Sequence, residues 1–223
     1  KVELHLHLEG CVTPELWLKL IQKYQPDAQT TIQALEARFV YASFFDFMDT
    51  YRDIIFSFQE PEDIYDLTKF VMNQLVQQNV RYCEVMFTPF FFVKRGIPYK
   101  EMMDAVDKAA KEVELNHPIV MKLIFDGPRN FGTEVVSEVF DMAINDTTGR
   151  VIGVGLGGDE LNYPATLFQK EFEKAQSCGL KLIAHAGETD GEQSMIDTIE
   201  KLKVNRIGHG IGITKNSKLD ALI

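Results

Sequence analysis

Short apolar runs rich in β-branched residues alternate along this chain with longer amphipathic stretches. Strict alternation or a short continuous apolar run is typical of a strand, whereas apolar positions spaced three and four apart are typical of a helix. The pattern predicts six strands: Val2–Leu8, Val80–Thr88, Ile119–Asp126, Val151–Gly155, Leu180–Ala186 and Arg206–Gly208.

Helices with recognisable ends are predicted between these strands. Thr13 is a typical N-cap residue, and Pro14 after it suits the first helical turn. A long helical interval from Pro14 to Asn79 lacks the composition of a linker, and Gly179 is a typical helix stop. The helices predicted within and after that interval are Pro61–Asn79, Tyr99–Leu115, Thr133–Asn145, Pro164–Cys178 and Glu192–Leu202.

Strand followed by helix, repeated, predicts an α/β fold with a parallel sheet. An open doubly wound sheet and a closed (β/α)8 TIM-type barrel share this alternation. Polar groups follow the C-terminal ends of the first, fourth, fifth and sixth predicted strands, and a barrel gathers those ends around one cavity. We therefore expect a single barrel domain over residues 1–223 in which about six of eight βα units are present, with the open sheet as the alternative.

Composition narrows the partners and the compartment. The chain has 33 acidic and 23 basic residues, and its net charge of -10 disfavours nucleic acid and anionic membrane surfaces. Cys11, Cys83 and Cys178 lie far apart without C-x-x-C spacing, which favours a reducing compartment over a disulfide framework or a thiolate metal site. With no signal-like leader and no apolar run of about 18 residues, a cytoplasmic protein is expected. Its oligomeric state stays open.

Four of the five histidines fall at the C-terminal ends of three predicted strands. His5 and His7 lie two apart on the first strand, so both side chains are expected on one face, where two imidazoles can bind one metal ion. A pair of hydrogen-bonded histidines is the alternative. His117, before Pro118 at a helix-to-strand turn, is interpreted as an ordinary surface residue.

Two further motifs extend this histidine pair. His185 lies in the segment Ala184–Glu188 and can supply a third nitrogen ligand, as in catalytic zinc sites that keep one position open for water. Glu188, three residues later, is placed for proton transfer near the metal. His209, between two glycines, can polarise the attacking water or stabilise a developing alkoxide; capping a strand end is its structural alternative.

These motifs, in this order, resemble the adenosine deaminase family of the amidohydrolase superfamily, near its adenine and aminodeoxyfutalosine deaminase branches. The resemblance covers essentially the whole chain. It implies a zinc ion held by His5, His7 and His185, with Glu188 as proton donor and His209 orienting the water. It also implies substrate contacts from three residues: His7, Glu9 and Gly158, the last through a backbone amide that meets purine N3.

The implied reaction replaces the 6-amino group of an adenine nucleoside with oxygen and releases ammonia. Activated water attacks C6 while Glu188 gives a proton to N1. Two-metal relatives carry a lysine at the end of the fourth strand, and Val151–Glu160 contains none, so one zinc ion per chain is expected.

Three departures from the family pattern bear on substrate and activity. Glu9 stands where the adenosine branch has aspartate, and glutamate there resembles the adenine or aminodeoxyfutalosine enzymes. The segment Gly155–Gly158 replaces Asp-Leu-Ala-Gly and, like the segment Arg95–Pro98, resembles the aminodeoxyfutalosine enzymes. The family's last zinc ligand, an aspartate ending the eighth strand, has no counterpart up to Ile223, so this polypeptide alone is not expected to be a competent enzyme. The hypotheses are therefore a nucleoside deaminase, an aminodeoxyfutalosine or adenine deaminase, an inactive fragment that keeps the purine pocket, and an enzyme of the same fold with another substrate.

Two more segments have competing interpretations. Phe87 and the run Phe90–Phe92 can roof a purine, but core or subunit packing is the favoured interpretation because aromatic side chains are ordinary core material. The segment Asp126–Arg129, after the third predicted strand, fits a substrate contact and a turn equally well.

Overall fold

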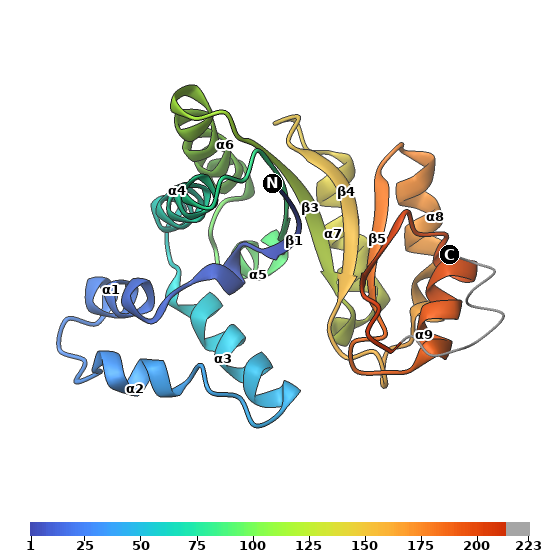
Figure 1. Cartoon of the computed structure of the whole chain (residues 1–223), viewed down its shortest axis with the longest axis horizontal. Helices are drawn as coiled ribbons and strands as arrows, with labels where there is room; N and C mark the ends of the chain where they lie inside the picture. Colours follow the sequence, from blue (N-terminus) through green and yellow to red (C-terminus); the bar gives the residue numbers. More distant parts are fainter. Residues whose placement is uncertain (213–223) are drawn as a thin grey trace. The chain divides into compact units, whose positions relative to one another are not determined.

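The computed structural model describes residues 1–212 (Figure 1). Its strands lie within one or two residues of the predicted positions at nearly every end. They are β1 Val2–His7, β2 Tyr82–Phe87, β3 Val120–Pro128, β4 Val151–Gly157, β5 Lys181–Ala186 and β6 Arg206–His209. The largest differences are of two residues: β2 begins at Tyr82 rather than Val80, and β3 and β4 end later because Asp126–Pro128 pairs with Gly155–Gly157.

The helices also follow the sequence pattern. The Thr13 hydroxyl accepts a hydrogen bond from the Leu16 amide at 3.3 Å, as expected of an N-cap. The predicted final helix changes to a π-turn over Thr198–Leu202. No helix among residues 1–212 combines the length and apolar character needed to cross a bilayer. The α-helices are α1 Pro14–Tyr24, α2 Ile32–Ala37, α3 Phe44–Ser57, α4 Pro61–Gln77, α5 Pro89–Val93, α6 Tyr99–Asn116, α7 Gly132–Ile144, α8 Gln169–Ser177 and α9 Glu192–Asp197.

The order of the strands distinguishes the two candidate architectures. Within the described residues they form one sheet in the order β1-β2-β3-β4-β5-β6, and the pairs from β3 to β6 are parallel. A doubly wound sheet reverses direction at a switch point, whereas a (β/α)8 barrel adds each strand beside the one before it. The expected fold class, a partial TIM-type barrel with six βα units, is confirmed over residues 1–212.

The chain divides into two compact units. The N-terminal unit comprises residues 1–85 and 91–121, and the C-terminal unit comprises 86–90 and the chain from 122 onward. In the N-terminal unit, the Arg95 guanidinium donates to the carbonyls of Ile55 and Phe56, both at 2.7 Å, and so caps the end of α3. Phe92 packs on Phe58 with ring centroids 5.9 Å apart, which confirms a core role for this aromatic.

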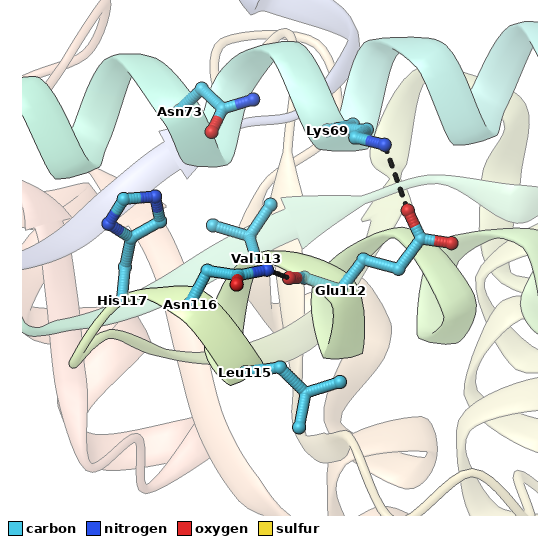
Figure 2. A pocket seen from close by; sticks show the side chains of 7 residues that line it. All are labelled: Lys69, Asn73, Glu112, Val113, Leu115, Asn116 and His117. Carbon is cyan, nitrogen blue, oxygen red and sulfur yellow. Dashed lines mark hydrogen bonds and ion pairs between the residues drawn. The ribbon is translucent and has the colours of Figure 1, made fainter.

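A shallow hollow lies between α4 and α6 of the N-terminal unit, as Figure 2 shows. Lys69 and Glu112 form an ion pair across it at 2.8 Å, and His117 lies at its edge. His117 is exposed, as predicted, and precedes the start of β3 rather than following a strand end. The hollow therefore lies apart from the strand ends that carry the other histidines of this unit.

The C-terminal unit has a sheet with two different faces. A Cβ added to Gly127 would meet Val136 and Phe140 of α7, so this face is covered by helices, and Figure 1 shows α7 and α8 beside β4 and β5. The opposite face carries a small cluster of Met86, Ile124 and Ile183. Because strand side chains alternate, the residues two positions later, Asp126 and His185, lie on that same face.

Candidate active site

His5 and His7 lie on one side of β1 in the N-terminal unit. Their ring centroids are 5.5 Å apart, with the rings at 69° to each other, and both residues are half-buried. Successive residues of a strand point to opposite faces, so residues two apart share a face. The predicted common orientation of the two imidazoles is therefore confirmed.

Glu9 follows β1 in the 3-10 turn Glu9–Cys11 and is completely buried. Next to it, the Cys11 thiol donates to the carbonyl of His7 at 3.1 Å. Burial, and then the negative charges of Glu9 and Glu3, raise the pKa of Cys11 to about 12. Cys11 is therefore a neutral thiol at physiological pH.

His185, Glu188 and His209 meet in the C-terminal unit at the neighbouring ends of β5 and β6. The Nδ1 atom of His185 lies 3.2 Å from Nε2 of His209. One carboxylate oxygen of Glu188 lies 3.5 Å from His185 Nδ1 and 3.3 Å from His209 Nε2. His185 is buried, whereas about a quarter of the side chains of Glu188 and His209 is exposed. The structure thus brings these three predicted residues together.

The backbone at His209 is unusual for a residue with a side chain. Its φ of +69° lies in the left-handed region, which costs a non-glycine residue about 1 kcal/mol or more. The Gly210 amide donates to the carbonyl of Ala186 at 3.0 Å and so anchors the end of β6 to β5. This conformation accompanies the contact of the His209 ring with His185 and Glu188, rather than a simple strand cap.

Glu160 holds the loop that carries Glu188, a role that the sequence did not reveal. Its carboxylate accepts hydrogen bonds from the amides of Gly187, Glu188 and Thr189 at 2.8, 2.8 and 3.0 Å, and from the Ser194 hydroxyl at 2.5 Å. Burial works to raise its pKa, but these four donors prevail and lower it. The sequence feature that could have identified Glu160 is its position among the polar residues that follow the glycines at the end of β4.

Arg129 is fully buried and supports the same strand ends. Its guanidinium donates to the carbonyl of His185 at 2.7 Å, and more weakly to those of Tyr163 at 3.3 Å and Leu156 at 3.4 Å. Burial lowers the pKa of Arg129, while nearby carboxylates, Glu160 foremost, oppose that shift. Because an arginine stays protonated, it is a buried cation that orients the backbone of His185.

Gly158 occupies a position that only glycine fits. Its φ is +105°, and a Cβ there would collide with the side-chain oxygen of Asn130. That oxygen accepts a hydrogen bond from the Asp159 amide at 2.8 Å. The close approach of Asn130 holds the backbone after β4 in place; the predicted contact of Gly158 with substrate stays a prediction.

The donor atoms in each unit suit a zinc ion. Zinc binds imidazole nitrogen and carboxylate oxygen at about 2.0–2.2 Å, so donors that share one ion lie about 4 Å or less apart. In the C-terminal unit the donors of His185, Glu188 and His209 lie within 4.8 Å of one another. In the N-terminal unit β1 presents two imidazoles together. That His5, His7 and His185 hold one ion stays a prediction.

Comparison with known proteins agrees with these motifs. The family model described as adenosine deaminase matches residues 1–223. The aminodeoxyfutalosine deaminase of Streptomyces avermitilis is 34% identical over 98% of this chain and 62% of its own length. The adenine deaminase of Paraburkholderia phytofirmans is 31% identical over 95% of this chain and 61% of its own. The chain thus spans about three-fifths of the length of these curated relatives.

Solved structures show the same fold. The adenine deaminase from Arthrobacter aurescens superposes with a TM-score of 0.90 at 27% identity, over 98% of this chain and 67% of its own. An amidohydrolase from Burkholderia ambifaria with bound Zn gives a TM-score of 0.89 at 25% identity, over 99% and 61%. With a family match along the whole sequence, the chain belongs to the adenosine deaminase family.

Proposed function

We propose that this protein is a zinc-dependent hydrolytic deaminase of a 6-aminopurine. The observation that carries the proposal is the contact of one Glu188 carboxylate oxygen with the imidazoles of both His185 and His209. A carboxylate and an imidazole within hydrogen-bond reach can transfer protons at neighbouring atoms of one substrate. Relatives named for deamination of aminodeoxyfutalosine and adenine support the reaction class.

In this proposal His5, His7 and His185 hold one zinc ion, and the two units form one barrel domain. The solved relative with bound Zn and the nitrogen donors of β1 and β5 support this ligand set. Bound zinc would supply Lewis acidity that lowers the pKa of a water molecule toward neutrality. The buried Arg129 contact holds the backbone of His185 in place for this role.

Glu188 and His209 carry out the proton transfers of the reaction. Glu188 gives a proton to N1 of the purine, so that electron density is drawn from C6 as the oxygen of water bonds there. His209 orients that water and takes up its proton. His209 then returns that proton to the amino nitrogen, the bond from C6 to nitrogen breaks, and ammonia leaves. The proton of the C6 hydroxyl group passes to Glu188, which restores its acid form and leaves the 6-oxopurine. The support for these roles is the position of both side chains at the ends of adjacent strands.

The substrate proposed first is an adenine nucleoside, bound by His7, Glu9 and the backbone amide of Gly158. Aminodeoxyfutalosine is the second candidate, favoured by Glu9 and by the 34% identical relative; free adenine is the third. We further propose a cytoplasmic protein with small-molecule partners. Its net charge of -10 and its three cysteines, which form no disulfide, support that setting.

A panel of five substrates tests the proposal: adenosine, deoxyadenosine, adenine, methylthioadenosine and aminodeoxyfutalosine. Ammonia release is measured with the full-length, zinc-loaded protein, and a Glu188→Gln variant serves as the matched control. We expect turnover of at least one substrate and at least hundredfold less in the control. No ammonia from any of the five, with stoichiometric zinc present, would reject the reaction in favour of a chain that only binds purines.

A further inference from the structure

Asp126 is a buried carboxylate with no role in the mechanism above. It lies on β3, with 6% of its surface exposed, and pairs in register with Gly155 of β4. Two residues later, Pro128 pairs with Gly157. The strand next to Asp126 therefore has no side chain at two successive positions of the same face.

The carboxylate of Asp126 fills the space that these two glycines leave. A Cβ on Gly155 would collide with its Oδ1, and a Cβ on Gly157 would lie 2.6 Å from its Oδ2. The same Cβ on Gly157 would lie 3.5 Å from Cε1 of His185. The carboxylate of Asp126 thus occupies the space over Gly155 and Gly157, which we call the glycine recess, and the ring of His185 lies at its border.

The glycine recess gives a physical account of the Gly155 departure. The adenosine branch has aspartate at the position of Gly155, and an aspartate there would project its carboxylate from β4 toward the space that Asp126 occupies. A second carboxylate on β4 would therefore collide with that of Asp126.

We infer that Asp126 is a positioning residue of the proposed metal site: its charge, held beside His185, strengthens binding of a divalent cation. The inference rests on the proposed function. Charges interact more strongly in a poorly solvated site than in water, and carboxylates beyond the direct ligands commonly tune metal affinity. The charge of Asp126 also acts on the buried Arg129, which contacts the His185 backbone. The alternative is a purely structural role, in which the negative charge of Asp126 only compensates the buried positive charge of Arg129.

Zinc affinity distinguishes a role of Asp126 in metal binding from a purely structural role, and its measurement does not depend on enzymatic turnover. It is measured by competition with a chromophoric chelator in the full-length protein. We expect Asp126→Asn to weaken zinc binding about tenfold, because a nearby negative charge is lost; losing a carboxylate that hydrogen-bonds a ligand costs about ten- to hundredfold. Asp159→Asn is the matched control, because Asp159 also acts on Arg129 but hydrogen-bonds within the 159–162 turn; its zinc affinity should stay within about threefold of wild type.

A second experiment moves the carboxylate from position 126 on β3 to position 155 on β4. With it, the inference does not depend on whether a single variant folds. Gly155→Asp alone should lower the melting temperature, because two carboxylates compete for the recess. Asp126→Ala with Gly155→Asp should recover the melting temperature and bring zinc affinity to within about threefold of wild type. Undiminished affinity in Asp126→Asn, or a folded double variant without recovery, would overturn the inference. Ammonia release is scored separately, so a wild-type protein that binds zinc without deaminating rejects only the proposed reaction.

Discussion

At the scale of single residues, the contacts of Glu188 support the proton-donor role that we propose for it. Its side chain is about a quarter exposed, and one oxygen contacts both His185 and His209. A carboxyl group between two imidazoles can exchange a proton with either, provided its geometry is maintained. Replacing that carboxyl group by an amide of nearly the same shape isolates the proton transfer from the packing.

Glu188→Gln should therefore reduce turnover about a hundredfold or more while zinc content stays close to that of wild type. The physical reason is that an amide cannot give up a proton to N1, whereas its size leaves the fold unchanged. Steady-state ammonia release and metal analysis on the same preparation measure both quantities. Wild-type turnover in this variant would remove Glu188 from the proposed role.

At the scale of elements, the connection from β5 to α9 depends on Glu160. Three consecutive amides of residues 187–189 and the Ser194 hydroxyl at the start of α9 all donate to its carboxylate. Gly187 adopts a φ of +67°, and a Cβ there would meet Met195 of α9 at 2.8 Å. One buried carboxylate thus determines the path of the loop that presents Glu188.

Glu160→Gln should destabilise the protein by about 2 kcal/mol or more at neutral pH, because hydrogen bonds to a buried charge are lost. The pKa of Glu160 is lowered below its ordinary 4.5, so its contribution is complete above that pH and disappears as pH falls through the folded-state pKa. The stability difference between wild type and variant should accordingly shrink below about pH 4.5.

Denaturant unfolding at several pH values measures this difference. Glu173→Gln is a suitable control, because Glu173 is exposed on α8 and accepts one hydrogen bond, from Gln169. Its stability should follow that of wild type throughout. A constant difference between Glu160→Gln and wild type from pH 7 to pH 3 would show that the charge of Glu160 is not what stabilises the loop.

At the scale of the whole molecule, the proposed zinc ligands come from both compact units. His5→Ala and His185→Ala should each lose zinc and lower the melting temperature by about 5–15 °C, because a metal bound to the folded state stabilises it by linkage. Metal analysis and thermal unfolding with and without added zinc measure both effects. His117→Ala, an exposed position in the N-terminal unit, should change neither. Zinc content equal to wild type in His185→Ala would refute the ligand assignment.

Much of this protein could be predicted from local sequence patterns. Thr13 caps α1, β5 and β6 lie where apolar runs predict strands, and His5 and His7 share a face because strand geometry repeats every two residues. Repeated strand–helix units also predicted an α/β fold with a parallel sheet. These features depend on neighbours in the chain, so the sequence alone determined them.

Tertiary structure alone decided how the site is supported. Glu160 binds the amide of a residue 27 positions later, and Arg129 binds a carbonyl 56 positions later. From sequence, the segment Asp126–Arg129 fits a turn as well as a substrate contact. In the structure, pairing with β4 extends β3 through Pro128 and places the Asp126 carboxylate over Gly155. Such contacts form where distant strands meet, and no local periodicity records which residues will be opposite each other. The sequence therefore determined the elements and the histidine motifs, whereas only the packing of strands decided which buried charges hold them.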